Sequence, residues 1–292
     1  MSTTTNPFRF THRLRVRWAE VDMQKIVFNA HYLMYLDTAI SDYWRALAMP
    51  YAAAMEQLGG DLFVKKATLE YHGSARFDEH IDVALRCDRI GTSSITFAGL
   101  IARGGTPLVS AELIYVFADP MTQTSRPVPA PLRQMLNAFE AGEPMVQCHV
   151  GSWQQLEAQS AAVRKPVFVG EQGIAADLVW DLADLTALHV VATNGLKQVV
   201  GAARLSRHGP GTARIGRMAV IKALRGAGFG QQLMALMEQS AQARGNHTIM
   251  LHAQRSAEGF YARLGYQPRG EAFEEAGIAH IEMVKRLAAP TA

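Results

Sequence analysis

The chain has 292 residues, of which 49% are hydrophobic and 19% charged, and its formal net charge is +3 at pH 7. This length allows two domains with a core each, and the composition is that of a globular protein. The net charge is too small to indicate a nucleic-acid-binding protein, but it suits local binding of a phosphorylated cofactor.

The start of the chain and its cysteines predict where the protein resides. The opening residues MSTTTNPF lack the apolar segment of a signal peptide, and no apolar run is long enough to span a bilayer. Cys87 and Cys148 lie far apart and have no metal-binding spacing, which indicates thiols in a reducing compartment. We therefore expect a cytoplasmic protein without a metal and without a membrane or nucleic-acid partner.

Residues 8–18 alternate strictly between apolar side chains and mostly basic ones. Period-two alternation predicts a half-buried strand with its arginines on the outer face. Two interpretations of these arginines are open: a solvated strand face, or one or two side chains that reach a ligand phosphate.

A long helix and four strands are predicted next. Apolar residues recur at helical spacing from Leu33 to Leu47, and Pro50 ends this helix. The strands span residues 63–71, 81–87, 94–102 and 109–117, with turn signals at Gly91-Thr92 and Gly104-Gly105. One long helix followed by an antiparallel meander predicts an α+β domain whose sheet wraps the helix.

Several segments of this half resemble hotdog-fold thioesterases of the 4-hydroxybenzoyl-CoA/YbgC type. They include Asp22-x-x-x-Ile-Val-Phe-x-x-x-Tyr32, Tyr71 to Asp78 and Gly91 to Phe97. The resemblance covers residues 8–139 and implies a hotdog domain within residues 1–140. It also implies that Asp22 is the catalytic base or nucleophile, and that backbone N–H groups near Asn29 polarise the thioester carbonyl. A helix N-terminus supplies such donors already oriented, and a nearby carboxylate attacks directly or activates water.

Three residues of this segment keep alternatives open. Asp22 by itself also fits a residue that only stabilises a helix N-terminus. His31, in the first helical turn, binds substrate or merely packs or caps. Lys25 stands where the family has glycine, so it either crowds the thioester or keeps Asp22 ionised as a neighbouring charge. The first domain is accordingly a thioesterase, or a non-catalytic acyl-CoA-binding or oligomerising module.

The hotdog resemblance also implies self-association. In that family the edge strands of the sheet pair across subunits, and an unpaired edge invites association. We expect a homodimer or homotetramer formed through the first domain.

The two halves are joined by a short linker. Prolines at 127, 129 and 131 follow the last predicted strand, and a short helix is predicted over residues 132–139. Ala141-Gly-Glu-Pro144 then predicts a linker. A strand over residues 145–150 and a helix over residues 153–163 open a second domain, which spans residues 145–292.

Residues 217–233, RMAVIKALRGAGFGQQL, predict a strand, a glycine-rich turn and an amphipathic helix. Glycines let the backbone approach a ligand, and the helix N-terminus offers unpaired N–H groups and a positive dipole end, so the segment predicts an anion site. The spacing is GxGxG, which excludes a GxGxxG dinucleotide loop. No Gly-Lys-Ser/Thr follows, which excludes a P-loop.

With its flanks, this turn resembles the acyl-CoA pyrophosphate loop of GNAT acetyltransferases. Residues 145–287 are similar to the ElaA-like branch of that family, through segments such as 167–174, 251–254, 260–266 and 277–283. The resemblance implies a mixed sheet flanked by helices, acetyl-CoA or coenzyme A as co-substrate, and an acceptor that is a small-molecule or peptide amine. Ala276 and Ala279 replace an acid and a proline in the presumed acceptor hairpin, which leaves the acceptor open.

The same resemblance implies roles for individual residues. Tyr261 donates a proton to the CoA thiolate, or is a packed aromatic with a satisfied hydroxyl. Glu171, His252 and His280 are candidates for substrate binding and for the base that deprotonates the amine. The residues implied to hold acetyl-CoA are Met218, Ala219 and Val220 along the pantetheine, and Arg225, Gly226, Ala227, Gly228, Phe229 and Gly230 around the pyrophosphate.

The sequence thus predicts a bifunctional enzyme, an acyl-CoA thioesterase followed by a GNAT N-acetyltransferase. A chain that turns over neither substrate and acts as a CoA-ligand sensor is the remaining alternative. The identities of the acyl group and of the amine are open.

Overall fold

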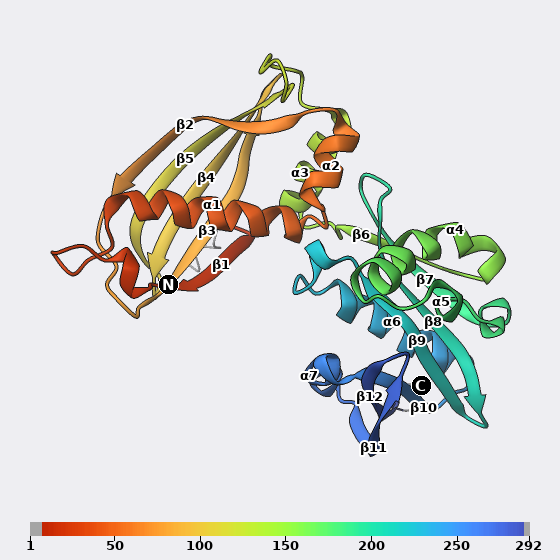
Figure 1. Cartoon of the computed structure of the whole chain (residues 1–292). Helices are drawn as coiled ribbons and strands as arrows, with labels where there is room; N and C mark the ends of the chain where they lie inside the picture. Colours follow the sequence, from red (N-terminus) through yellow and green to blue (C-terminus); the bar gives the residue numbers. More distant parts are fainter. Residues whose placement is uncertain (1–7, 289–292) are drawn as a thin grey trace. The chain divides into compact units, whose positions relative to one another are not determined.

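The computed structural model of the protein describes residues 8–288 (Figure 1). The first seven residues, on which the expected lack of a signal peptide partly depends, lie outside this range. The chain divides into two compact units, Met1–Met145 and Val146–Ala292. A five-stranded sheet forms the first unit and a seven-stranded sheet the second. None of the helices that residues 8–288 form has both the length and the apolarity needed to cross a membrane.

The sheet of the first unit is antiparallel, with the strand order β1-β3-β4-β5-β2. Figure 1 shows it curving round the long helix α1, which spans Asn29–Ala46. The predicted helix and the antiparallel sheet that wraps it are therefore confirmed. Only β3, β4 and β5 form a meander, because β2 pairs with β5 and not with β3 as expected. The strands are β1 (Phe10–Arg15), β2 (Asp61–Tyr71), β3 (His80–Ile90), β4 (Ser94–Arg103) and β5 (Thr106–Ala118).

Tyr43 of α1 is the centre of an aromatic cluster that fixes this helix in the unit. Its ring packs edge-on against Phe97 of β4 at 5.3 Å and against Phe139 of α3 (Ala130–Ala141) at 5.1 Å. The Tyr43 hydroxyl donates a 2.6 Å hydrogen bond to Glu140. A buried tyrosine hydroxyl needs such a partner, and this bond joins α1 to α3. A shorter helix, α2 (Tyr51–Leu58), follows Pro50.

The first strand is shorter than its alternating pattern predicts. β3 begins at His80, opposite Arg15, and the pairing beyond it is limited to the backbone bonds of Val16 with Asp78 and Glu79. Residues 18–20 instead form a 3-10 turn, η1 (Trp18–Glu20). Trp18, predicted on the buried face, is 77% exposed. The prediction was wrong at this end because alternation continues past the point where the neighbouring strand stops.

Carboxylates within the same unit lie beside three of the arginines that follow this pattern. The Arg15 guanidinium is 2.7 Å from Asp78, that of Arg17 is 2.5 Å from Glu20, and that of Arg13 is 3.8 Å from Asp82. These pairs favour the solvated strand face over contact with a ligand phosphate.

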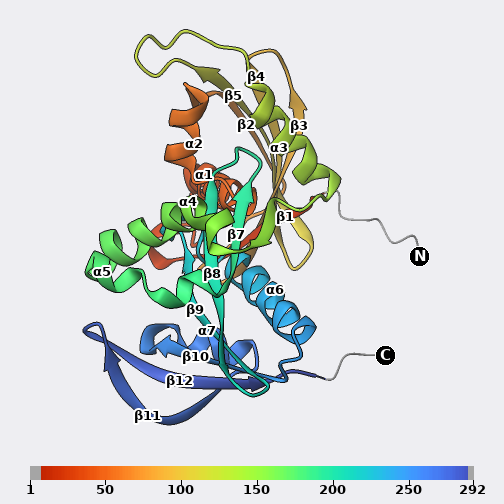
Figure 2. The same ribbon diagram turned by 90° about the vertical axis from the view of Figure 1, so that its right-hand side faces the viewer.

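The sheet of the second unit is mixed, with the order β11-β12-β10-β9-β8-β7-β6 and one parallel pair, β10 with β9. Figure 2 shows the helices α4 and α6 on opposite faces of this sheet, so a mixed sheet flanked by helices is confirmed. The strands are β6 (Val146–Gly151), β7 (Leu188–Asn194), β8 (Val199–Gly209), β9 (Thr212–Val220), β10 (Thr248–Gln254), β11 (Gln267–Glu275) and β12 (Ile278–Arg286). The helices are α4 (Trp153–Arg164), α5 (Ala176–Val179), α6 (Phe229–Ala243) and α7 (Glu258–Arg263).

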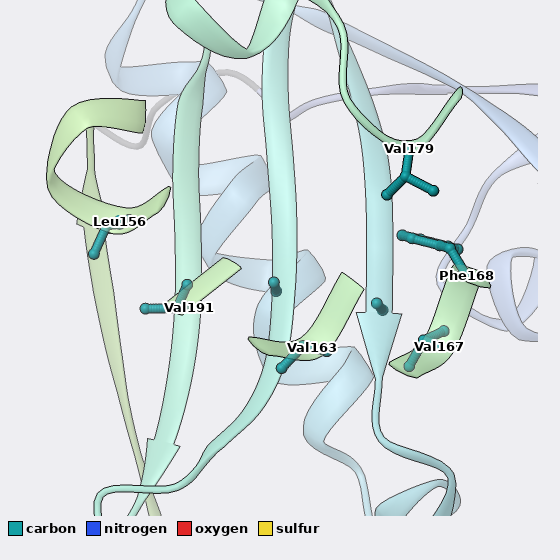
Figure 3. Packing of buried hydrophobic residues seen from close by; sticks show 8 residues of the cluster. Leu156, Val163, Val167, Phe168, Val179 and Val191 are labelled. Atoms are coloured by element: carbon teal, nitrogen blue, oxygen red, sulfur yellow. The ribbon is translucent and has the colours of Figure 1, made fainter. Parts of the chain in front are cut away.

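A buried cluster joins α4, the following π-helix η2 (Lys165–Glu171) and α5 to one face of strands β7, β8 and β9 (Figure 3). The strands β8 and β9 contribute the small residues Ala202 and Ala219, which leave room for the larger side chains of the helices. The other members are Leu156, Val163, Val167, Phe168, Val179 and Val191. Close packing of this kind holds backbone and side chains in one arrangement.

A network of charged groups lies buried beside this core. Arg164, at the end of α4, is fully buried and donates to Asp184 at 2.8 Å. Arg204 of β8 lies 3.0 Å from the same carboxylate. His189 donates through Nε2 to the Asp184 carbonyl at 2.9 Å, so its Nδ1 is left to accept from Arg164 at 3.2 Å. Burial lowers the pKa of His189, which favours this neutral form.

Candidate functional sites

The loop that carries Asp22 is closed by its own backbone. The N–H of Asp22 donates to the carbonyl of Ile26, and the N–H of Lys25 donates to the carbonyl of Asp22, both at 2.9 Å. The Asp22 carboxylate accepts from the N–H of Gln24 at 2.8 Å. These bonds fix the carboxylate a few residues ahead of Asn29, the first residue of α1.

Lys25 adopts the left-handed backbone conformation, with φ of 62°. Glycine takes this conformation without steric cost, and other residues rarely do. The loop therefore has the backbone shape that glycine favours, although lysine occupies the position. The Lys25 side chain is exposed and is not among the residues that line the neighbouring pocket.

A surface pocket of about 460 Å³, here called the Asp22 pocket, opens where this loop meets α1. The first N–H groups of a helix have no intrahelical partner and lie at the positive end of its dipole. The Tyr71 hydroxyl donates to the carbonyl of Asn29 at 3.2 Å and so fixes one wall. The lining consists of Asp22, Met23, Gln24, Ile26, Val27, Phe28, Asn29, Tyr32, Tyr71, Gly73 and Ser74.

His31 is not among the residues that line the Asp22 pocket. Its Nδ1 lies 3.2 Å from the Met34 sulfur, and its ring packs edge-on against Phe28 at 6.0 Å. The structure thus brings Asp22 and Asn29 together and places His31 in packing contacts on the helix.

Glu20, which the sequence analysis did not single out, braces the Asp22 loop. Its side chain is buried and accepts from the Tyr35 hydroxyl and from the N–H of Arg17, both at 2.7 Å. Burial alone would raise the pKa of Glu20, but the bonds from Arg17 and Tyr35 outweigh burial and lower it. Its carbonyl accepts from the N–H of Phe28 at 3.0 Å. Glu20 therefore links the start of the loop to α1 twice, through its carboxylate to Tyr35 and through its carbonyl to Phe28, the N-cap residue.

In the second unit, strands β9 and β10 separate part of the way along. Their parallel pairing runs from Thr248 opposite Thr212 to Met250 opposite Arg214 and then ends. A pocket of about 380 Å³, here called the β9–β10 pocket, lies between the strands beyond that point. Residues 214–220 of β9 line one side, and Leu251, His252 and Gln254 of β10 line the other. Backbone groups of β9 that point toward β10 have no ladder partner there.

The glycine-rich turn follows β9 and a short 3-10 turn, η4 (Lys222–Leu224). Gly226 and Gly228 both have φ of 86°, and Gly228 is the N-cap of α6. A Cβ atom added to either glycine would meet no protein atom within 4 Å, so the space next to the turn is open. Of the residues predicted to hold acetyl-CoA, Met218, Ala219, Val220 and Arg225 line the β9–β10 pocket. Gly226, Ala227, Gly228, Phe229 and Gly230 continue from Arg225 outside that lining.

Glu171 is held away from the pocket by Arg225. The Arg225 guanidinium donates twice to the Glu171 carboxylate, at 2.6 and 2.8 Å. These bonds lower the pKa of Glu171, and its side chain is outside the pocket lining. A carboxylate bonded in this way is a weak base, so Glu171 is less suited than His252 or His280 to deprotonate the amine.

His252 lies in the β9–β10 pocket beside two residues that the sequence analysis missed. Its Nδ1 is 2.7 Å from a Glu275 carboxylate oxygen and 2.9 Å from an Arg214 guanidinium nitrogen. Burial would raise the pKa of Glu275, but the hydrogen bond with His252 and the nearby positive charges outweigh it and lower the pKa. Glu275 stands directly before Ala276, the position where an acid was expected.

His280 and Tyr261 complete this pocket. A carbonyl only accepts, so the 2.7 Å contact of His280 Nδ1 with the Ile278 carbonyl places a hydrogen on Nδ1 and leaves Nε2 as an acceptor. Tyr261 of α7 is 9% exposed, and burial raises the pKa of its hydroxyl to about 12. That hydroxyl is protonated at neutral pH, and it has no hydrogen-bond partner within residues 8–288.

These features define the class of protein. An antiparallel sheet wrapped round α1 gives the first unit the hotdog fold, and a mixed sheet that separates beside a glycine-rich turn gives the second unit the GNAT fold. Both folds are those expected from the sequence. Within the part of the chain that is described, no group of three or more His, Cys, Asp or Glu side chains is arranged to hold a metal.

Comparisons with known proteins agree with both assignments. A family model for the thioesterase-like superfamily matches residues 16–139, and one for the acetyltransferase (GNAT) domain matches residues 171–287. The uncharacterized N-acetyltransferase YjcF of Bacillus subtilis is 37% identical over 124 residues, which cover 42% of this chain and 87% of YjcF. A putative esterase of Aquifex aeolicus is 27% identical over 103 residues, which cover 35% of this chain and 80% of that protein.

A solved structure, that of a putative N-acetyltransferase from Lactobacillus plantarum, aligns with a TM-score of 0.47 at 28% identity. The alignment covers 50% of this chain and all (100%) of that one. By its likeness to YjcF and the match of its second unit, the chain belongs to the GNAT acetyltransferase family, and a thioesterase-like domain precedes its GNAT domain.

Proposed function

We propose that the chain is a bifunctional acyl-CoA enzyme. The first unit hydrolyses an acyl-CoA thioester, and the second transfers an acetyl group from acetyl-CoA to an amine. The observation that carries the proposal is the β9–β10 pocket, which joins His252, His280 and Tyr261 in one cavity next to the glycine-rich turn. In the first unit, the matching support is Asp22 in a pocket at the N-terminus of α1.

Hydrolysis in the first unit uses the charge distribution at the start of α1. The thioester carbonyl oxygen accepts hydrogen bonds from the first N–H groups of the helix, which stabilise the negative charge that develops on it. Asp22 then attacks the carbonyl carbon or removes a proton from an attacking water. The carbon–sulfur bond breaks, and the CoA thiolate leaves and takes up a proton. When Asp22 is the nucleophile, the acyl group stays on its carboxylate as an anhydride, which water then hydrolyses. The closed loop and the Glu20 brace support this role because they hold the carboxylate in place.

Acetyl transfer in the second unit follows from the open edge of β9. The pantetheine arm of acetyl-CoA lies along Met218, Ala219 and Val220 as an added strand would, and the pyrophosphate meets the N-terminus of α6. His252, braced by Glu275, or His280 through Nε2 removes a proton from the amine. The amine nitrogen bonds to the acetyl carbon, the carbon–sulfur bond breaks, and Tyr261 protonates the leaving thiolate.

The test is to incubate the pure protein with a panel of acyl-CoA thioesters, with and without amines, and to follow free thiol. Thiol release without an amine reports hydrolysis, and an amine-dependent increase with acetyl-CoA reports transfer. Asp22→Asn should lower the first signal by about a hundredfold or more, and Tyr261→Phe should reduce the second. If no acyl-CoA is hydrolysed while transfer proceeds, the first unit is a binding or oligomerising module. If neither signal appears, the chain senses a CoA ligand without turning it over.

The oligomerising role has an observation of its own. β2 lies at the edge of the first sheet, and Phe63, Val64 and Tyr71 on it are 37%, 54% and 50% exposed. A long edge strand with apolar side chains is a template for pairing with another chain.

We therefore predict a homodimer or homotetramer that forms through β2. Sedimentation at micromolar concentration should show it, and Val64→Glu should shift the protein toward monomer because the charge would be buried in the contact. Leu182→Glu, a substitution at an exposed position of the second unit, is the control. A wild-type monomer at this concentration contradicts the prediction.

Gly228→Val should weaken acetyl-CoA binding by about tenfold or more, because a side chain at the N-cap of α6 blocks approach of the pyrophosphate. Valine also strains a backbone at φ of 86°, so the control must share that strain. Gly245, just beyond the other end of α6, has φ of 77° and equally open surroundings, which makes Gly245→Val a matched variant. Calorimetry that finds equal affinity for the Gly228 and Gly245 variants contradicts the site.

A further inference from the structure

We propose that the acetyl acceptor of the second unit is a small amine that also carries an oxyanion, either a carboxylate or a phosphate. This inference rests on the proposed function, because it takes the β9–β10 pocket as the place where the acetyl group moves. It concerns a second cavity next to that pocket and the charges that surround this cavity.

The second cavity, here called the outer pocket, has a volume of about 850 Å³. It shares Arg204, Ser206 and Arg214 with the β9–β10 pocket, so the two pockets lie next to each other. Arg214 lies 2.9 Å from the Nδ1 of His252. An amine that reaches His252 therefore extends past Arg214 into the outer pocket. The remaining lining is Asp181, Leu182, Ala183, Thr186, Arg207 and His208.

The negative charge of the outer lining is already neutralised. Asp181 accepts from Arg204 at 2.6 and 3.0 Å and from Arg217 at 2.8 Å. Burial would raise the pKa of Asp181, but these two arginines outweigh it and lower the pKa. The carboxylate thus stays ionised and stays bonded to arginine, so it offers little to a cationic ligand.

The positive groups of the outer pocket, in contrast, include some without a carboxylate partner. Among them, Arg207 takes part in no ion pair within residues 8–288. Arg214 is 3.9 Å from its nearest carboxylate, that of Glu275. The cavity next to the base therefore carries a surplus of positive charge.

This surplus selects among amines. A diamine or a lysine-rich peptide would bring further positive charge against Arg207 and Arg214, which is unfavourable at short range. A carboxylate or a phosphate oxygen pair instead accepts parallel hydrogen bonds from a guanidinium, the geometry for which arginine is suited. An amine with an oxyanion several bonds away suits both pockets, with its nitrogen at His252 and its oxyanion at Arg207.

The test uses pairs of amines that differ in the oxyanion. With acetyl-CoA present, amine-dependent thiol release is measured for 4-aminobutyrate against 4-aminobutyramide, and for phosphoethanolamine against ethanolamine. The oxyanion-bearing member of at least one pair should have a kcat/KM at least about tenfold higher, the scale of one charge-assisted hydrogen bond. The pair that shows the larger ratio distinguishes a carboxylate from a phosphate.

Variants locate the effect. Arg207→Gln should raise KM for the oxyanion-bearing amine by about tenfold and leave the neutral amine and acetyl-CoA affinity unchanged, and Arg207→Lys should restore part of the loss. Arg244→Gln removes an exposed arginine elsewhere in the unit and should change neither amine.

Equal kcat/KM values within both pairs, or a preference for a diamine, would overturn the inference and leave acetyl transfer intact. Failure to acetylate any amine would count against the proposed function, and binding then decides the inference. Inorganic phosphate is titrated into the wild type and into Arg207→Gln, and the inference requires that the wild type binds it more tightly. Equal affinity of the two proteins, or no binding to either, overturns the inference.

Discussion

Asp22→Asn should lower thioester hydrolysis by the first unit by about a hundredfold or more, the scale of a lost general base. Asparagine keeps the shape of the side chain and an oxygen that accepts from the N–H of Gln24, a bond of 2.8 Å in the wild type. The loop and the Asp22 pocket should therefore persist. What is lost is the charge that attacks the carbonyl carbon or activates water. The measurement is free thiol released from acyl-CoA in the absence of an amine.

Two comparisons make this result specific. Asp37→Asn removes an exposed carboxylate from α1, about two turns from the start of that helix, and should leave hydrolysis unchanged. Acetyl transfer by the second unit should survive Asp22→Asn, because its pocket is built from residues after position 166. Hydrolysis at the wild-type rate in the variant would make Asp22 a residue that only stabilises the helix N-terminus.

Asp184→Ala should have the largest effect on stability, a loss of about 3 to 5 kcal/mol from the second unit. The substitution leaves Arg164 fully buried without the carboxylate that accepts its 2.8 Å bond. A buried charge without a partner is far more costly than a pair. Chemical denaturation followed by tryptophan fluorescence should report this loss of stability, because Trp153 and Trp180 lie 5.2 and 5.6 Å from the Arg164 guanidinium.

Acid should act on the same network. Burial lowers the pKa of His189, so the unfolded chain binds a proton that the folded chain does not once the pH falls below about 6.5. The pKa of Asp184 is also lowered, because the Arg164 bond and nearby charges outweigh burial, and its contribution is lost below about pH 4. Stability of the second unit should therefore fall as pH falls. Asp177→Ala, at an exposed position of α5, is the control, and an unchanged denaturation midpoint in Asp184→Ala contradicts the predicted loss of stability.

The elements that sequence alone predicted are those whose signal is local. Helix α1 follows from apolar residues at helical spacing, and strands β3, β4 and β5 follow from alternation between turn residues. The exposed position of Trp18 was missed because its pattern is locally that of a strand. Whether such a strand continues depends on β3, whose partner residues begin at His80, about sixty positions away in the chain.

The sequence predicted those candidate residues that lie in recognisable family motifs. Asp22, His252, His280 and Tyr261 lie in segments that resemble known families, and the structure places each of them at a pocket. Glu275 was missed because its contact with His252 joins strands β11 and β10, which meet only through β12.

Glu20 was missed for a related reason. Its partner Tyr35 lies fifteen residues further along, on α1, and burial of the carboxylate depends on the packing of the whole loop. Side-chain pairs of this kind are set by tertiary packing, which periodicity does not encode.

The early end of the β9–β10 pairing has a consequence for the dynamics of the second unit. Amide hydrogens of β9 that point toward β10 beyond Arg214 have no sheet acceptor, so they should exchange with solvent faster than those that point toward β8. A ligand that lies between the strands as an additional strand would protect the same amides. It would also raise the thermal midpoint of the second unit as its concentration increases, while the sheet of the first unit kept its own midpoint.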